Sequence, residues 1–140
     1  MLKDNSYIKI NNSIGLFKNV HLIGQVAQEE INKFYKMADI FVCTSGDELL
    51  GLVILEAMSY GKTIIASNVG GIPEIIDHQI SGILIPKDDS HALMSNIIRL
   101  CEDKKYKAAL GRNAYKKLND AFTQEKCGNR FLEIIEQQSL

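Results

Sequence analysis

Glu48, Gly51 and Glu56 lie in a short segment, residues 43–61, whose pattern suits the binding of a phosphorylated ligand. A small polar loop carries Glu48 and ends at Gly51, and an apolar run then continues toward Gly61. A glycine at the start of a helix lets a ligand approach backbone N–H groups that have no partner inside the helix, and the helix dipole makes this end positive. The segment therefore predicts a site for phosphate or another anion near Gly51.

Glu56 is the unusual residue of this predicted helix. The apolar residues around it leave no polar face, so the helix should be buried on most sides. A buried carboxylate without donors costs several kcal/mol, roughly, and helical side chains lean toward the N-terminus, which points Glu56 back over Leu52 toward the anion site. Two neighbouring hydroxyls, such as those of a ribose, would satisfy it, and a backbone turn or a lysine would do so in a structural role. Glu48 lies in the loop just before this helix. In a functional role it would face the same anion site, and otherwise it would be a solvated loop residue.

A second glycine-rich turn, residues 68–74, follows the next predicted strand and also exposes N–H groups at a helix start. Taken alone, Gly70 and Gly71 indicate a tight turn more often than a binding site. Two such loops after adjacent strands are better evidence for one shared anionic ligand.

Short apolar strands alternate with helices along most of the chain, which predicts one α/β domain with a parallel sheet flanked by helices and ending in three helices. Functional loops of such a domain lie at the carboxyl ends of its strands. The expected strands are Val20–Ile23, Ile40–Cys43, Thr63–Ala66 and Gly82–Ile85. The expected helices are one ending at Gly15, then 28–38, 52–60, a short one at 71–74, 88–101 capped by Asp89 or Ser90, 105–118, and 123–136 capped by Thr123.

The composition excludes several classes of protein. The chain has 140 residues, with 16 basic and 17 acidic side chains, which argues against an electrostatic nucleic-acid binder. Its longest apolar run, Leu52–Leu55, is far shorter than a membrane span, and its first residues lack the apolar core of a secretory signal. Three cysteines far apart fit neither a disulfide framework nor a zinc site, and the three histidines share no metal-ligand spacing. We expect a cytoplasmic protein, with a peripheral place at the inner membrane face left open, and no metal.

A family resemblance rests on residues 48–76, E-L-L-G-L-V-I-L-E-A-M-S-Y-G-K-T-I-I-A-S-N-V-G-G-I-P-E-I-I. This run strongly resembles the donor-binding domain of retaining GT-B glycosyltransferases, above all the large family numbered four, or group 1. The family's E-x7-E motif matches Glu48 and Glu56, and its G-G-x-P-E turn matches Gly70–Glu74. Three further segments agree in order, L-F-K-N-V-H-L-I-G-Q-V (16–26), Y-K-M-A-D-I-F-V-C-T-S (35–45) and F-T-Q-E-K (122–126). The departures are small: Leu50 stands where the family often has Phe, and Thr44 precedes Ser45 where it often has Pro.

The resemblance implies a role for each matched residue in transfer from a nucleotide-diphospho-sugar, UDP- or GDP-linked, with no metal and no other cofactor. Glu48 would be the catalytic residue that binds hydroxyls of the donor sugar, and Glu56 would bind the ribose. Backbone N–H groups of Gly51, Leu52 and Val53 would hold the diphosphate. The remaining donor-binding positions implied are Gly24, Gln25 and Val26 beside the base, with Ser45, Gly70 and Gly71.

The resemblance also implies that this sequence is only part of such an enzyme. The family has two Rossmann-like domains with the active site between them, and the N-terminal acceptor domain is absent from residues 1–140. The first strands of the donor domain, with the Arg and Lys that grip the diphosphate, are absent too, and Lys62 occupies a structural position. In the family's sheet the strand order is 3-2-1-4-5-6, where Val20–Ile23 would be the third strand and Ile40–Cys43 the fourth. Strands 1 and 2, which are absent here, would lie between them. These two strands therefore either pair directly or leave an exposed sheet edge. A partner could cover such an edge; it would be a chain supplying the N-terminal domain or a second copy.

Two other classes of function stay open beside the donor-domain fragment serving polysaccharide or glycolipid assembly. The chain could be a non-catalytic nucleotide-sugar-binding subunit of a split enzyme, or an inactive truncated remnant. A dinucleotide oxidoreductase is disfavoured, since no G-x-G-x-x-G follows any predicted strand. The sequence names neither the base, the sugar nor the acceptor.

Overall fold

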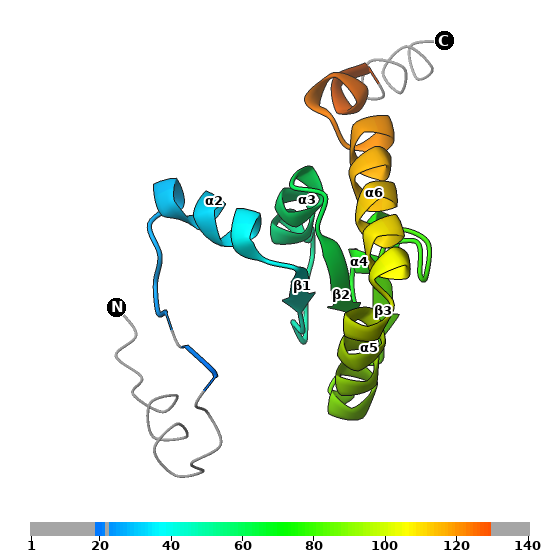
Figure 1. The fold of residues 1–140 in the computed structure, drawn as a ribbon. Helices are drawn as coiled ribbons and strands as arrows, with labels where there is room; N and C mark the ends of the chain where they lie inside the picture. The colour runs from blue at the N-terminus through cyan, green and yellow to red at the C-terminus, as the bar shows by residue number, and fades with distance from the viewer. Residues whose placement is uncertain (1–18, 22, 130–140) are drawn as a thin grey trace. The chain divides into compact units, whose positions relative to one another are not determined.

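The computed structural model describes residues 19–21 and 23–129 (Figure 1). These residues belong to two units, which divide between Ile31 and Asn32. In the first unit, Val20, His21 and Ile23 have an irregular backbone, so the predicted strand there is wrong for these residues. The alternating pattern is only four residues long, and a strand exists only when another strand supplies its hydrogen bonds. The predicted helix ending at Gly15 lies outside the described residues. Helix α2 (Gln28–Met37) follows and confirms its prediction.

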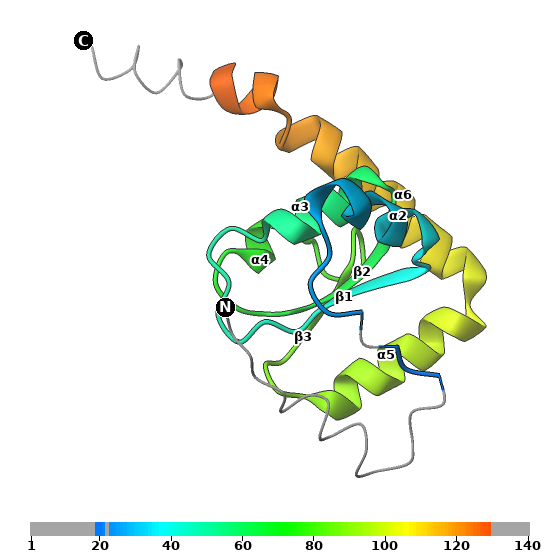
Figure 2. The same ribbon diagram turned by 90° about the vertical axis from the view of Figure 1, so that its left-hand side faces the viewer.

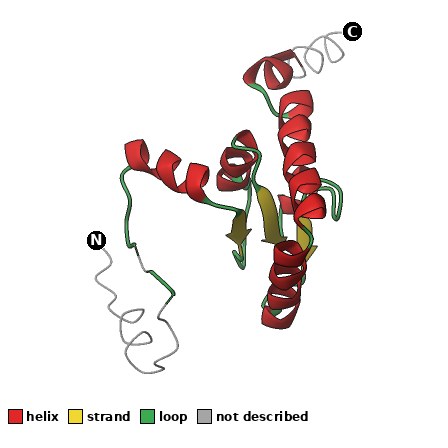
Figure 3. Cartoon of the chain, in the orientation of Figure 1, coloured by secondary structure: helices red, strands yellow, loops and turns green. Residues whose placement is uncertain are grey.

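A parallel sheet of three strands forms the centre of the second unit (Figures 1 and 3). Strands β1 (Ile40–Cys43), β2 (Thr63–Ser67) and β3 (Ile83–Ile85) are hydrogen-bonded in the order β1-β2-β3. All five residues of β2 are buried, as expected for the central strand of a sheet covered on both faces. Strand β1 pairs with β2 along one side, which makes it an edge strand among the described residues.

Helices cover both faces of this sheet (Figure 2). On one face Ile65, Ile83 and Ile85 pack with Leu100 of α5 (Ser90–Glu102) and Leu110 of α6 (Lys104–Ala121). Side chains alternate along a strand, so Ile64 and Ala66 point to the opposite face. Helix α3 (Leu52–Ser59) lies on the other side of the sheet from α5 in Figure 2 and contributes the fully buried residues Ile54, Ala57 and Met58. The short helix α4 (Ile72–Ile75) begins with Pro73 in its tolerated first turn.

Side-chain caps fix the starts of the later helices. Asp89 accepts a hydrogen bond from the Ala92 N–H at 2.8 Å, which resolves the choice between Asp89 and Ser90. Thr123 Oγ1 accepts from the Lys126 N–H at 3.3 Å, and residues 124–129 are helical as predicted; the rest of that predicted helix lies outside the described residues. Each cap satisfies an N–H group that the helix itself leaves unpaired.

The expectation that α3 is buried on most sides is wrong for its first turn. Leu52 is 61 % exposed and Val53 41 % exposed, whereas only Ile54, Ala57 and Met58 are fully buried. The sheet and α6 contact this helix, whereas Leu52 stays mostly exposed. An apolar sequence identifies a helix that can be buried, but the neighbouring elements decide which faces are.

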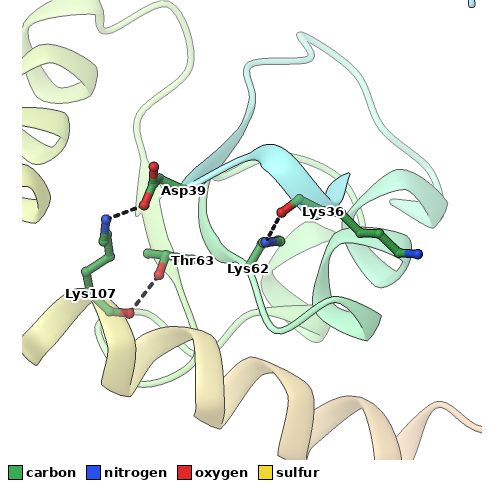
Figure 4. Close-up of polar contacts among 5 residues, drawn as sticks. All are labelled: Lys36, Asp39, Lys62, Thr63 and Lys107. Carbon is green, nitrogen blue, oxygen red and sulfur yellow. Dashed lines mark hydrogen bonds and ion pairs between the residues drawn. The ribbon is translucent and has the colours of Figure 1, made fainter. Parts of the chain in front are cut away.

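Polar contacts fasten α6 to the amino ends of the strands, away from the loops that carry the candidate site (Figure 4). Lys107 Nζ forms an ion pair with Asp39 at 2.8 Å, and the Lys107 carbonyl accepts a hydrogen bond from the Thr63 hydroxyl at 2.7 Å. Lys62 Nζ donates to the Lys36 carbonyl, 2.9 Å away, near the C-terminus of α2. This contact gives Lys62 the structural role expected of it.

The Asp39–Lys107 pair predicts a small acid-dependent loss of stability. The hydrogen bond and charge of Lys107 lower the pKa of Asp39, so the pair stabilises the folded state above the ordinary carboxyl pKa of about 4 and stops doing so as pH falls. The carboxyl group is exposed, so the effect is modest. We expect the unfolding temperatures of wild type and Asp39→Asn to differ near neutral pH and to converge below about pH 3. A difference in unfolding temperature that stays the same at every pH would contradict this prediction. So would an equal pH-dependent difference for Asp120→Asn, a variant of an exposed aspartate on α6.

Candidate functional site

Glu48 lies in the loop between β1 and α3 and fixes the start of that helix. Its Oε1 accepts a hydrogen bond from the Gly51 N–H at 3.1 Å. Gly51 adopts a left-handed conformation, with φ 58° and ψ 34°, which glycine alone reaches at no cost. A Cβ on Gly51 would also lie only 2.9 Å from Ile75 Cδ1. The other carboxylate oxygen of Glu48 has no hydrogen-bond partner within residues 19–21 and 23–129, so it is available to a ligand.

The first turn of α3 presents unpaired backbone donors. Gly51 N–H is bound by Glu48, and the Gly51 carbonyl receives the N–H groups of Ile54 and Leu55. The N–H groups of Leu52 and Val53 have no acceptor among the described residues, as is usual at a helix N-terminus. Together with the dipole of α3 they can bind an anion, which is the chemistry expected of this segment.

The second glycine-rich turn packs directly on the Glu48 loop. Gly71 N–H donates to the Glu48 carbonyl at 3.2 Å. Gly70 has φ +51°, and a Cβ there would overlap the Glu48 carbonyl oxygen, while a Cβ on Gly71 would overlap the Leu49 carbonyl oxygen. The two loops therefore do meet, as the parallel topology required. This contact gives Gly70 and Gly71 a packing role and leaves the Gly71 N–H engaged within the protein.

Glu56 projects from the half-buried side of α3 and receives a hydrogen bond from Tyr35 of α2. The Tyr35 hydroxyl lies 2.7 Å from Glu56 Oε2 and 3.5 Å from the Val53 carbonyl, so the carboxylate lies beside the preceding turn of its own helix. This is the N-terminal lean expected of it. Burial and the neighbouring carboxylate raise the pKa of Tyr35 above its usual range, so the hydroxyl keeps its proton and continues to donate at neutral pH.

The Tyr35 ring is itself held in place by two aromatic neighbours. Its centroid lies 5.5 Å from the stacked ring of Tyr60 and 5.6 Å from the tilted ring of Phe41. Tyr35 belongs to the matched segment 35–45, but the sequence predicts no role for it, and a backbone turn or a lysine was the structural partner expected for Glu56. A tyrosine among the apolar positions of a helix was the signal that could have found it, because a buried phenol seeks an acceptor.

The other expected site residues lie in two places. Ser45 follows β1, where its hydroxyl lies 3.5 Å from Cys43 Sγ. Gly24, with φ +74°, belongs to the first unit together with Gln25 and Val26, so its position relative to α3 is not described. Lys87, which sequence reasoning did not connect with the site, lies along Gly46 of the Glu48 loop: a Cβ on Gly46 would be 3.4 Å from Lys87 Nζ.

No metal centre is formed by the part of the chain that the structure describes. No three His, Cys, Asp or Glu side chains gather there in a way that could hold an ion. His78 has a structural contact, since its Nδ1 accepts from the Leu84 N–H at 3.0 Å. Within the same residues, no helix is long and apolar enough to cross a membrane.

Comparison with known proteins identifies the family. Residues 3–117 match the family model for glycosyl transferases group 1. The amylovoran biosynthesis glycosyltransferase AmsK of Erwinia amylovora is 34% identical over 124 residues, 84% of this chain and 30% of that protein. The N-acetyl-alpha-D-glucosaminyl L-malate synthase of Bacillus anthracis is 32% identical over 123 residues, 85% of this chain and 32% of that protein. The chain thus spans about a third of the length of these relatives.

Solved structures share the fold. The Anabaena protein HepE in complex with UDP superposes with a TM-score of 0.86 at 26% identity, over 98% of this chain and 38% of that one. The sucrose-phosphate synthase of Thermosynechococcus elongatus gives a TM-score of 0.84 at 28% identity, over 96% of this chain and 34% of that one. The parallel sheet with helices on both faces is therefore the Rossmann-like half of a GT-B fold. Fold, family model and motif residues agree, and this chain belongs to the group 1 glycosyltransferases.

Proposed function

We propose that this chain is the donor-binding part of a retaining, metal-independent glycosyltransferase and binds a nucleotide-diphospho-sugar at the N-terminus of α3. The observation that carries the proposal is the pair of unengaged N–H groups of Leu52 and Val53, fixed in place by the Glu48–Gly51 hydrogen bond. The solved relative HepE holds UDP or UDP-glucose, which supports a uridine diphosphate donor. AmsK, named for amylovoran biosynthesis, supports a role in polysaccharide assembly.

The bound donor would use each group of the site differently. The diphosphate accepts hydrogen bonds from Leu52 and Val53, and the free oxygen of Glu48 accepts from sugar hydroxyls. Glu56 accepts from ribose hydroxyls while Tyr35 holds it in place, and Ser45 lies along the rest of the donor. During transfer the bond between the anomeric carbon and the phosphate oxygen breaks, a bond from an acceptor hydroxyl oxygen to the same carbon forms, and the proton of that hydroxyl passes to the leaving diphosphate. The helix dipole stabilises the charge that develops on this diphosphate.

A nucleotide-sugar-binding subunit is the second candidate, and one observation favours it. Strand β1 is an edge strand in the described part of the sheet, so one of its sides is open to pairing with another strand. Transfer would then require a partner that supplies the acceptor domain and covers β1, either another chain or a second copy. The proposed location is the cytoplasm or the inner face of the membrane.

Nuclear magnetic resonance of the ¹⁵N-labelled chain, titrated separately with UDP, GDP and NAD, tests the proposal. We expect UDP or GDP to shift the amide signals of Leu52 and Val53, with a dissociation constant on the order of 1 mM because few cations surround the site. Uridine and guanosine, which lack the diphosphate, are the controls and should leave these two amides unchanged. Binding of neither nucleotide would contradict the proposal and leave an inactive remnant, and preferential binding of NAD would point to a different class of protein.

A further inference from the structure

A pocket lies at the carboxyl ends of the strands, bordered by the connection from β3 to α5. It has a volume of about 220 Å³, and the residues that line it include Thr44, Ser67, Ile85, Pro86, Asp88 and Ser90. We call it the sheet-end pocket. Its strand residues belong to the sheet face on which Ile65 and Ile85 pack against α5 and α6. Helix α3, which carries Glu56, lies on the other side of the sheet from α5 (Figure 2), so the pocket adjoins the Glu48 loop at Thr44 but is lined by other residues than those of the donor site proposed above.

Ser67 contributes a buried hydroxyl to this pocket. Three polar residues are buried in the described part of the chain, Thr63, Ser67 and Ser81. The Thr63 hydroxyl donates to the Lys107 carbonyl, and the Ser81 hydroxyl accepts from the Asp77 N–H. Ser67 is 1 % exposed, and its hydroxyl has no partner among the described residues.

A buried hydroxyl without a partner is costly, and other buried side chains here avoid that cost. No side-chain nitrogen or oxygen sealed from solvent within the described residues lacks a partner. The Ser67 hydroxyl is therefore not fully sealed from solvent, and Ser67 is one of the residues that line the sheet-end pocket. It is placed to bind a group that enters from solvent.

Asp88 supplies a carboxylate to the same pocket. It occupies a turn in which the Asp89 N–H donates to the Pro86 carbonyl at 3.3 Å, and it has the uncommon positive φ of 59°. Asp89 is already engaged as the cap of α5, since its Oδ1 accepts from the Ala92 N–H. The Asp88 carboxylate has no hydrogen-bond or ion-pair partner in residues 19–21 and 23–129, so it remains free for a ligand.

The lining of the pocket discriminates among ligand classes. Two adjacent carboxylates repel a phosphate, despite the helix N-terminus beside them. A divalent cation needs more ligands than one free carboxylate, and the described residues form no metal cluster. Hydroxyl and carboxylate groups that share a pocket with Ile85 and Pro86 instead match a pyranose, whose hydroxyls form hydrogen bonds while its C–H face packs on apolar carbon.

We propose that the sheet-end pocket binds a neutral sugar ring, through hydrogen bonds from its hydroxyls to Ser67 and Asp88 and packing against Ile85 and Pro86. The ring is either a free monosaccharide or the end of a glycan chain. The pocket does not depend on the donor function proposed above, because it uses none of the same residues. It gives the domain a second, uncharged carbohydrate site.

Titration of the ¹⁵N-labelled 140-residue chain with glucose, galactose, mannose, their methyl glycosides and maltose tests this proposal. We expect one or more of them to shift the amide signals of Thr44, Ser67 and Asp88, with a dissociation constant on the order of 1–10 mM, and to leave Leu52 and Val53 unchanged. Tighter binding of maltose than of monosaccharides would identify a glycan end as the ligand, and the reverse a free sugar.

Two variants and a control make the test specific. Ser67→Ala and Asp88→Asn should each weaken sugar binding about fivefold or more while leaving the UDP-induced shifts unaltered. Ser67→Ala should change the melting temperature by no more than about 2 °C, since no internal hydrogen bond is lost. Ser95→Ala, on α5 and outside the pocket, should bind like wild type. The proposal is overturned if no sugar shifts these amides at about 100 mM, if magnesium or phosphate shifts them instead, or if Ser67→Ala and Asp88→Asn bind sugar normally.

Discussion

Gly70→Ala should lower the free energy of unfolding of this domain by about 4 kcal/mol or more, enough to leave much of the chain unfolded at room temperature. The added Cβ would overlap the Glu48 carbonyl oxygen, and the positive φ of 51° adds further strain for any residue with a side chain. Relief would require the two glycine-rich loops to separate, which would break the hydrogen bond from the Gly71 N–H to the same carbonyl. Urea unfolding followed by circular dichroism measures the loss.

Gly61→Ala is the matched control for this effect. Gly61 has a similar φ of +63°, but a Cβ there would meet only the Gly111 carbonyl oxygen, at 4.0 Å. It should therefore cost only the strain of the left-handed conformation, about 1–2 kcal/mol. Equal losses for the two variants would show that backbone conformation, and not the approach of the Glu48 loop, makes Gly70 necessary.

Glu56→Ala should weaken the binding of UDP or GDP about 10- to 100-fold, because a carboxylate that accepts hydrogen bonds from ribose contributes more than a neutral acceptor. The same titration that tests the donor site measures this change. Unchanged affinity would remove Glu56 from the site and leave it a structural carboxylate bound to Tyr35 at 2.7 Å. Glu102→Ala, an exposed glutamate at the end of α5, should bind like wild type.

Tyr35→Phe tests whether the orientation of the Glu56 carboxylate matters for binding, because the variant keeps this carboxylate but removes the hydroxyl bound to it. The variant keeps the ring contacts with Phe41 and Tyr60 but removes the hydroxyl that donates to Glu56. We expect a smaller loss of nucleotide affinity than for Glu56→Ala, because the carboxylate remains but is no longer held in one orientation. A loss as large as that of Glu56→Ala would instead indicate that the Tyr35 hydroxyl itself contacts the ligand.

Local patterns in the sequence determined most of the secondary structure. The apolar runs ending at Cys43 and Ile85 and the caps at Asp89 and Thr123 are features of neighbouring residues, so they can be found without a structure. The strand expected at Val20–Ile23 failed in its described residues because pairing, which no local pattern contains, decides whether an extended segment joins a sheet.

The sequence by itself also determined the family. The spacing of Glu48 and Glu56 and the turn Gly70–Glu74 form a motif of residues close together in the chain, which can be recognised without a structure. The tertiary structure alone decided which groups those residues meet. Tyr35 is 21 residues from its partner Glu56, and the Gly71 N–H donates a hydrogen bond to the Glu48 carbonyl in another loop. It also decided that Ser67, which follows the strand expected at Thr63–Ala66, is the buried last residue of β2 and lines a pocket. Such contacts depend on how strands and helices pack, and the energy of that packing is not encoded in any short stretch of the chain.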